Sequence, residues 1–231
     1  MVRSGSTWSF NVALELVRAG DPNRKTFGLF SEDPVVLQSA ARPRSSNLVI
    51  KSHKLDPSVR ELCHAGAIKA IYTWRDPYDT VCSCMRMFGW SLEESIQALR
   101  DALRLWAFHK TTRSACIVSY EAIVQQPGAS IAALAAYLGV EIEAEQFARI
   151  TNATSLQSAR AMSQRVNRLG QSRLARSEGH VYDRQTLYHQ GHIIDGGIGY
   201  GSKELLLQQR SAIEAAILEE GFSSLCEPNP A

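Results

Sequence analysis

The sequence lacks several features that would place it at once in a large class of proteins. None of its apolar runs is long enough to cross a bilayer, and the N-terminus has no apolar signal-peptide segment. The net charge of +2 is too small to indicate nucleic acid or a membrane surface as a partner. The five cysteines are an odd number without paired spacing, which favours reduced thiols. These absences together predict a soluble cytoplasmic protein with no transmembrane segment.

Metal-ligand spacing is also missing. Cys82-Ser83-Cys84 has no second ligand pair at zinc spacing, and His180, His189 and His192 match no familiar metal site. The sequence therefore predicts that no metal is bound.

What the sequence does contain is an alternation of short apolar runs with segments of helical periodicity. The apolar runs predict buried strands at residues 48–50, 67–74 and 116–118. The periodic segments and their capping residues predict helices at 6–19, 58–63, 77 onward, 92–112, 128–138, 143–149 and 203–219. Strands that alternate with helices predict an α/β fold, a three-layer sandwich with a central parallel sheet whose ligands lie at the carboxyl ends of the strands.

Two stretches do not fit this alternation. Residues 21–46 are rich in Pro, Ser, Asn and Arg and are predicted to form a long loop with one short helix at about 34–41. Residues 160–184 hold six arginines against two acidic residues, and the stretch 160–186 is poor in core positions. This basic stretch is interpreted as a solvated face or as a mobile lid at about 160–190 on a single domain of residues 1–231.

The stretch Arg3-Ser4-Gly5-Ser6-Thr7-Trp8 leads directly into the first predicted helix. A Gly/Ser/Thr loop that opens a helix points backbone N–H groups at one spot, in front of the positive end of the helix dipole, and so predicts a phosphate or sulfate cradle. A plain serine-capped helix start is the alternative. Such a loop normally follows a buried strand, yet only Met1 and Val2 precede it. Either the sheet lacks a full first strand, or that strand is truncated and the chain starts further upstream.

Polar side chains follow the predicted strands where each strand ends. Lys51 and His53 are two residues apart, so both project from the same face if the strand continues. Arg75 precedes a helix that Asp76 is placed to cap, and Tyr120 follows the third strand. Because the carboxyl ends of parallel strands meet at one edge, we expect these side chains to share a site.

In this order the segments resemble those of the sulfotransferases that use 3′-phosphoadenosine-5′-phosphosulfate (PAPS). The loop at 3–8 is similar to the family's 5′-phosphosulfate loop, and Lys51-Ser52-His53 is similar to its Lys-Thr-His segment, which carries the catalytic base. The family's 3′-phosphate motif is matched at all four positions, by Arg75, Pro77, Asp79 and Ser83. Tyr120-Glu121 resembles the pair near the adenine, and Thr154-Ser155-Leu156 resembles a later Thr-Ser-aromatic segment. The similarity spans roughly residues 3–205.

The sequence departs from the family pattern at two places. Arg3 stands where cytosolic members have Lys, although members that act on carbohydrates often have Arg. Where the family has Arg-Lys-Gly-x-x-Gly, this chain has residues 194–199, which keep the glycines, Gly196 included, but not the arginine that grips the 3′-phosphate. Our hypothesis is that a basic residue of the lid substitutes for it: Arg173, Arg184 or His192.

The resemblance implies a P-loop NTPase-like sulfotransferase fold and transfer of a sulfuryl group from PAPS to a hydroxyl or amine. His53 would act as general base, and Arg3 and Lys51 would stabilise the charge on the transferred group. Donor contacts are expected from Ser4, Gly5, Ser6, Thr7, Trp8, Arg75, Ser83, Tyr120, Thr154, Ser155, Leu156 and Gly196. The acceptor is expected to be a small molecule, a lipid or a glycan, bound by 21–47, Phe88-Gly89-Trp90 and 160–190.

Two other functions are compatible with parts of the sequence. A catalytically weak protein that binds PAP (the desulfated donor) or another nucleotide would explain the missing arginine near Ile194. A small P-loop kinase is disfavoured, because the loop lacks the Gly-Lys-Ser/Thr of a Walker A motif and no convincing magnesium-binding acid follows a strand. The sequence indicates no oligomeric state.

Overall fold

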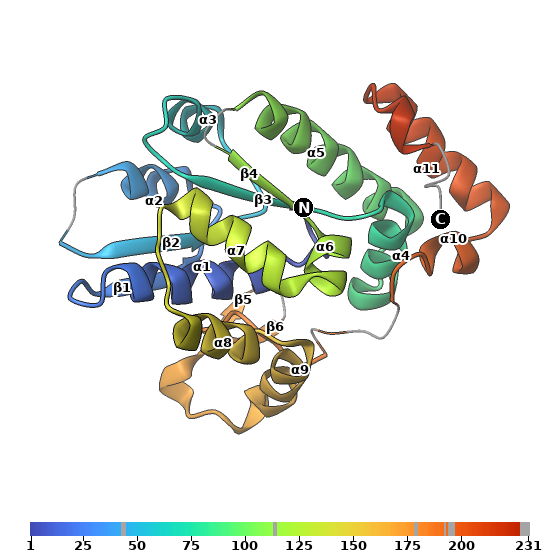
Figure 1. The fold of residues 1–231 in the computed structure, drawn as a ribbon. Coiled ribbons are helices and arrows are strands. Elements are labelled where there is room, and N and C mark those ends of the chain that lie inside the picture. The colour runs from blue at the N-terminus through green and yellow to red at the C-terminus, as the bar shows by residue number, and fades with distance from the viewer. Residues whose placement is uncertain (43–44, 113–114, 178–179, 192, 194–196, 227–231) are drawn as a thin grey trace.

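The structure of the chain, a computed structural model, describes residues 1–42, 45–112, 115–177, 180–191, 193 and 197–226 (Figure 1). Its helices are α1 (Ser6–Gly20), α2 (Pro34–Gln38), α3 (Pro57–His64), α4 (Pro77–Phe88), α5 (Leu92–Thr111), α6 (Tyr120–Gln125), α7 (Pro127–Leu138), α8 (Ala144–Ala153), α9 (Leu156–Arg165), α10 (Gly201–Glu204) and α11 (Leu207–Glu219). Its strands are β1 (Thr26–Phe30), β2 (Asn47–Lys51), β3 (Ala70–Trp74), β4 (Ala115–Ser119), β5 (Leu174–Ser177) and β6 (His180–Asp183).

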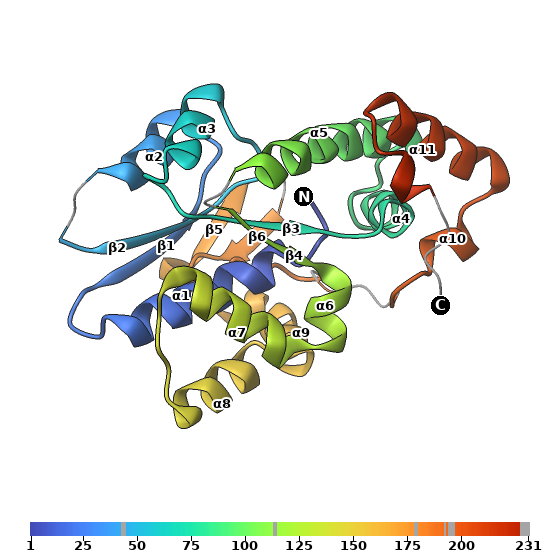
Figure 2. The ribbon, with the colours of Figure 1, turned by 45° about the horizontal axis from the view of Figure 1, so that its top comes forward.

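The parallel strands form two separate pairs. β1 pairs with β2, with Phe27 opposite Leu48, and β3 pairs with β4, with Tyr72 opposite Ile117. The predicted single central sheet is therefore not formed among the described residues, because β2 and β3 share no ladder hydrogen bonds. Figure 2 shows α2, α3 and α5 on one side of these strands and α1 and α7 on the other. α1 contacts both β2 and β3, so it joins the two pairs.

The prediction that residues 21–46 form a long loop with one short helix was wrong in part. Residues Thr26–Phe30 form β1, and the short helix is confirmed as α2 followed by a 3₁₀ turn at Ser39–Ala41. Gly28 weakens the strand pattern in the sequence, but its backbone lies where a Cβ would be 2.7 Å from Phe10 Cζ. β1 is thus stabilised by its pairing with β2 and by close packing on α1, neither of which is visible in the local sequence.

The helix boundaries that rest on capping residues are confirmed. Asp76 accepts a hydrogen bond from the Asp79 N–H at 2.9 Å and Pro77 takes the first turn of α4. Ser91 and Glu94 form the capping box that starts α5.

The predicted last helix at 203–219 is instead broken into α10 and α11. Leu206 adopts an extended conformation between them, and its N–H donates to Gln209 Oε1 at 2.8 Å, which starts a new helix. At the other end of α11, Arg104 of α5 donates to both carboxylate oxygens of Glu220, at 2.6 and 2.9 Å. The C-terminal helix is therefore held against α5.

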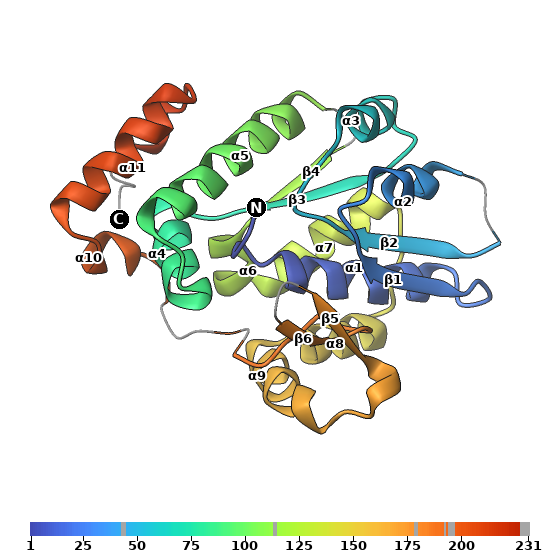
Figure 3. The same cartoon turned by 180° about the vertical axis from the view of Figure 1, so that it is seen from behind.

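The prediction that residues 160–186 are poor in core positions agrees with the structure: Val166 is the one buried apolar side chain among the described residues of this stretch. The stretch contains the end of α9 and the antiparallel hairpin β5–β6, which Figure 3 shows on the same side of the molecule as α8 and α9. Val166 packs with Ala159 and Tyr188, which lie on either side of the stretch in the sequence, in a small buried cluster. The stretch is therefore folded but contributes little to the core.

Two larger clusters form the main core. One lies between β3, α4, α5 and α11 and includes Leu99, Leu103 and Ile213. The other lies between α1, α7 and β4 and includes Leu16 and Ile131. No helix in the described part of the chain is long and apolar enough to cross a membrane.

Candidate functional site

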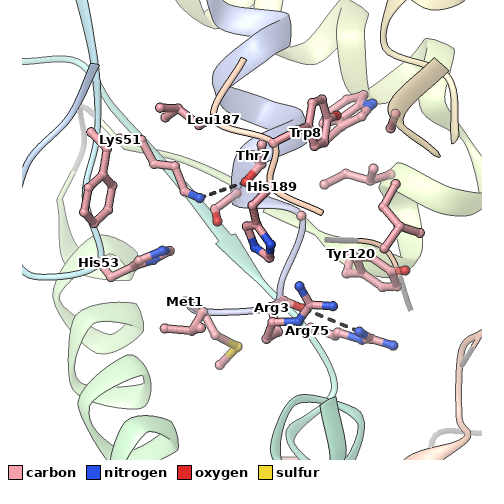
Figure 4. Close-up of a pocket in the computed structure, with 18 of the residues that line it drawn as sticks. Met1, Arg3, Thr7, Trp8, Lys51, His53, Arg75, Tyr120, Leu187 and His189 are labelled. Atoms are coloured by element: carbon pink, nitrogen blue, oxygen red, sulfur yellow. Dashed lines mark hydrogen bonds between the residues drawn. The ribbon is translucent and has the colours of Figure 1, made fainter. Parts of the chain in front are cut away.

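A cavity of about 760 Å³ lies where β2, β3 and β4 end, and the start of α1 forms part of its wall (Figure 4). Its volume is within the usual range for small-molecule sites. The structure brings most of the predicted site residues to this cavity: Arg3, Gly5, Ser6, Thr7, Trp8, Lys51, His53, Arg75, Tyr120, Thr154, Ser155 and Leu156. Gly196 lies outside the described residues.

The loop before α1 has an unusual backbone. Arg3 has φ 60° and Gly5 has φ 86°, both in the left-handed region that disfavours side chains. A Cβ at Gly5 would lie 2.9 Å from Ile123 Cδ1, so any other residue would need a shift of the Ile123 side chain in addition to the unfavourable φ. Strained residues of this kind persist where the surrounding structure fixes them, and here the strain lies in the wall of the cavity.

Ser4 anchors this loop to β3. Its fully buried hydroxyl lies 2.7 Å from Thr73 Oγ1 and 3.0 Å from the Thr73 carbonyl oxygen. Ser4 is not among the described residues that line the cavity. Its contacts thus assign it a structural part in the loop, and a direct donor contact stays a prediction.

Lys51 is the last residue of β2, and its side chain points at the loop of residues 3–8, the phosphate-type loop. Its Nζ donates to Thr7 Oγ1 at 2.8 Å, as Figure 4 shows. Burial, together with the positive charge of Arg3, lowers the pKa of Lys51 to about 8. Lys51 is therefore mostly protonated at neutral pH, but it binds its proton less tightly than an exposed lysine does.

His53 follows Lys51 at the edge of the cavity. Its ring lies against Phe30, with 5.8 Å between the centroids, and its buried Nδ1 has no hydrogen-bond partner among the described residues. Burial first, and the nearby charge of Lys51 second, hold the pKa of His53 well below 6.5. The imidazole is therefore neutral at pH 7 and carries a lone pair that can accept a proton.

Arg75 is buried at the end of β3 and fixed on several sides. Its Nη2 lies 3.4 Å from Asp79 Oδ2 and donates to the Gly197 carbonyl oxygen at 2.9 Å. Its guanidinium lies over the ring of Tyr120, 4.0 Å from the centroid. Its Nε is buried and has no partner among the described residues, although other atoms of the side chain line the cavity.

Ser83 contacts Arg3 across the site. Arg3 Nε donates to Ser83 Oγ at 3.0 Å, and Ser83 is buried behind the arginine. The structure therefore gives Ser83 a part in orienting Arg3, while the expected pairing of Ser83 with Arg75 around one phosphate stays a prediction. Burial also lowers the pKa of Arg3.

Two of the three basic residues that we considered as substitutes for the missing arginine, Arg173 and Arg184, flank the β5–β6 hairpin. Arg173 donates to both carboxylate oxygens of the fully buried Asp183, at 2.7 and 3.2 Å. Arg184 Nε donates to the Leu174 carbonyl oxygen at 2.7 Å. His192 lies outside the described residues.

The sequence reasoning missed the central part that Asp79 plays. This carboxylate is fully buried and accepts hydrogen bonds from the N–H groups of Gly199 at 2.8 Å and Gly201 at 2.7 Å. It joins the glycine-containing segment 197–201 to Arg75, more than a hundred residues earlier in the chain. A buried acid in the first turn of a helix, on the same face as Ser83, was the available signal.

Segment 182–189 contributes part of the cavity wall, and it lies within the stretch 160–190 that we expected to bind the acceptor. Tyr182, Leu187, Tyr188 and His189 all line the cavity. The sequence did not single out these four side chains for that part, and it named His189 by itself only as a possible metal ligand. Within the described residues no group of His, Cys, Asp or Glu could hold a metal ion.

Comparison with known proteins gives a family and a fold. The family model described as the sulfotransferase domain matches residues 3–186. No curated protein shows significant sequence similarity to the chain. Among solved structures, the chain resembles mouse sulfotransferase SULT7A1 complexed with PAP, at 14% identity and TM-score 0.66, covering 95% of this chain and 81% of that one. It also resembles retinol dehydratase in complex with androsterone and PAP, at 15% identity and TM-score 0.56, covering 95% of this chain and 78% of that one.

Proposed function

The chain belongs to the sulfotransferase domain family, and we propose that it moves a sulfuryl group from PAPS to a hydroxyl or amine of a small acceptor. The observation that carries the proposal is the convergence of Arg3, Lys51, His53 and Arg75 on one cavity beside a loop of phosphate-binding type. The relatives of similar fold whose structures contain PAP support the choice of donor.

The described side chains fit a doubly phosphorylated donor. Arg3, Lys51 and the N–H groups at the start of α1 would hold the 5′-phosphosulfate, since all of them present positive charge or donors to one region. The guanidinium of Arg75, which lines the cavity, would hold the 3′-phosphate, and Tyr120 would lie near the adenine. Thr154, Ser155 and Leu156 line the same cavity and would complete the nucleotide site.

The reaction would proceed by in-line displacement at sulfur, by analogy with phosphoryl transfer. The acceptor oxygen or nitrogen forms a bond to sulfur while the bond from sulfur to the 5′-phosphate oxygen breaks, and that oxygen leaves with the electron pair as PAP. His53 takes the proton of the acceptor as general base. Arg3 and Lys51 stabilise the negative charge on the sulfuryl and leaving phosphate oxygens.

The apolar part of the cavity favours a small acceptor with a hydrophobic body. Phe30, Phe88, Trp90 and Tyr188 line it, and the rings of Phe88 and Trp90 lie 4.6 Å apart. An apolar wall of this kind binds a compact alcohol or phenol through its hydrocarbon surface and leaves its hydroxyl toward His53. A glycan acceptor, which presents mainly hydroxyl groups, is less well matched by these side chains.

Calorimetric titration with PAP tests the donor site directly. We expect the wild-type chain to bind PAP and not to bind ATP comparably, and the Arg75→Ala variant to lose at least about 10-fold in PAP affinity, because charge-assisted hydrogen bonds are the strong ones. Arg18→Ala is the matched control, since Arg18 is exposed on α1 and pairs only locally with Glu15. Failure of the wild-type chain to bind PAP would contradict the proposal.

A protein that binds PAP without transferring sulfuryl groups is the second candidate, because residues 194–199 lack the arginine usual in the family. Incubation with PAPS and a panel of phenols and alcohols separates the two functions. PAP binding with release of PAP from PAPS supports the enzyme, and PAP binding without turnover supports the binding protein.

A further inference from the structure

The cavity contains a histidine that lies beyond the matched segment 3–186 and outside the predicted motifs. His189 lines the cavity together with Arg3, Lys51, His53 and Arg75. In Figure 4 its ring extends from its own segment toward Arg3. A second imidazole therefore lies beside the cations Arg3, Lys51 and Arg75 that the donor would meet.

The backbone of His189 is fixed on both sides. Ser163 Oγ donates to the His189 carbonyl oxygen at 2.7 Å, and Tyr182 forms a β-bridge with His189. The Asp183 N–H donates to the Tyr188 carbonyl oxygen at 2.9 Å, and the Asp183 carboxylate is bound by Arg173. The segment that carries the imidazole is thus part of a hydrogen-bonded structure.

The same segment is tied to the phosphate-type loop. Asn11 Nδ2 donates to the Thr7 carbonyl oxygen at 2.7 Å and to the Thr186 carbonyl oxygen at 2.9 Å. Leu187 packs on Phe10 and other apolar residues of α1. Because one side chain bonds both backbones, the histidine keeps its place relative to the loop.

The chemistry of the ring follows from its neighbour. His189 Nδ1 lies 3.0 Å from the Gln190 carbonyl oxygen, and a carbonyl oxygen only accepts, so Nδ1 carries the hydrogen. A second proton must then add at Nε2. The protonated ring would present Nε2–H as a charge-assisted donor.

We propose that His189 contacts the donor: its protonated imidazole donates from Nε2 to an oxygen of the 5′-phosphosulfate of PAPS, and to the 5′-phosphate of PAP. This inference rests on the proposed function. It makes His189 a binding residue that adds positive charge when the anion is present.

The charges around the cavity couple this contact to pH. Arg3, Lys51 and Arg75 are cations that disfavour protonation of His189 in the empty site, and His53 is neutral. The other titratable groups of the lining are the phenols of Tyr120, Tyr182 and Tyr188, Glu32 with its ion-pair partner Lys54, Asp101, and the Met1 α-amine, whose pKa burial lowers to about 5. An incoming phosphate reverses the balance, so PAP binding is accompanied by uptake of a proton at His189.

Calorimetry with PAP across about pH 5.5 to 8.5 tests this contact. The wild-type chain is compared with His189→Ala and with His189→Gln, which keeps a neutral donor. His64→Gln is the matched control, since His64 is exposed on α3 and lies outside this cavity. Titration in two buffers of different ionisation enthalpy measures the protons taken up.

We expect His189→Ala to weaken PAP binding about 10-fold near pH 6 and less than about 2-fold near pH 8.5. The PAP affinity of His189→Gln should fall between the affinities of the wild-type chain and of His189→Ala, and PAP binding to His189→Gln should no longer take up this proton. The 5′-phosphate of PAP titrates in the same range, but it does so equally for every variant, so the difference between curves isolates His189.

Two results would overturn the inference while leaving the proposed function intact. One is coincidence of the wild-type and His189→Ala curves at every pH. The other is an equal loss at every pH together with a lowered Tm, which indicates a purely structural part. If the wild-type chain binds no PAP, the proposed function fails, and the inference fails with it.

Discussion

His53 shows how the surroundings of a single residue decide its chemistry. An exposed histidine is partly protonated near neutral pH, whereas burial and the charge of Lys51 keep this imidazole neutral. The proposed base is therefore in its unprotonated form over the whole neutral range.

Removal of this imidazole gives the first prediction at this scale. His53→Ala should lower the rate of PAP release from PAPS, in the presence of a phenolic acceptor, by at least about 100-fold, the lower end for a positioned base. PAP affinity should change little, because the neutral ring supplies no charge to the donor. For the wild-type chain, the rate should stay level as pH falls to about 6.5 and decline only below it. His64→Ala serves as the control, and a His53→Ala variant that keeps most of its activity would remove His53 from the mechanism.

At the scale of elements, α10 packs so closely on α4 at Gly201 that there is room for the glycine hydrogen but not for a Cβ. A Cβ at Gly201 would lie 2.3 Å from the Tyr78 carbonyl carbon and 2.5 Å from the Asp79 nitrogen. These are backbone atoms, which cannot move aside as the end of a side chain can. The contact lets Asp79 bind the Gly199 and Gly201 N–H groups and so holds segment 197–201 beside Arg75.

Gly201→Ala should therefore separate α10 from α4. We expect a loss of about 2 kcal/mol or more in the free energy of unfolding and a Tm lower by about 5 °C, together with weaker PAP binding through Arg75. Gly170→Ala is the matched control, because nothing lies within 4 Å of a Cβ there and its φ of −61° suits alanine. Equal thermal stability of the two variants would show that α10 is free to shift.

Helix-capping residues in the sequence were sufficient to predict where the helices next to them begin. The helices that start at Asp76 and Ser91 were predicted because their caps lie next to them in the chain. β1 was missed because the glycine at position 28 interrupts its pattern and its stability comes from β2 and α1.

The candidate site was predictable to a similar extent. Motif order was enough to bring Lys51, Arg75 and Tyr120 to one cavity. The bond from Arg3 to Ser83 spans 80 residues. The stretch 160–190 was expected at the acceptor site, but the sequence did not show which of its side chains line the cavity. No local periodicity encodes such contacts, so they required the structure.

Across the whole molecule, folding buries histidines that would be charged in the unfolded chain at mildly acidic pH. His109 of α5 packs in the core beside Tyr72, with 4.9 Å between the ring centroids, and its Nδ1 is buried with no hydrogen-bond partner in the described part of the chain. Burial lowers the pKa of His109 from 6.5 to about 4. His53 shifts in the same direction. At mildly acidic pH the unfolded chain therefore binds protons at these histidines that the folded chain does not bind.

The sign of the effect on stability follows from this difference in proton binding. Above pH 6.5 His109 is neutral in both the folded and the unfolded chain, so its protonation does not change the free energy of unfolding. As pH falls from 6.5 toward 4, the unfolded chain binds the proton first and the folded state loses stability relative to it. The loss that this one histidine causes should be about 2 kcal/mol between about pH 7.5 and pH 5.

Urea unfolding of the wild-type chain and of His109→Phe at those two pH values measures this contribution. Phenylalanine keeps an aromatic ring beside Tyr72 and cannot be protonated, so the variant should lose at least about 1 kcal/mol less stability on acidification than the wild type. His64→Phe changes an exposed histidine in the same way and should leave the difference between the two pH values unchanged. Parallel losses in the wild-type chain and His109→Phe would mean that His109 is already accessible to protons in the folded state, and that the core between β3 and α5 opens to solvent.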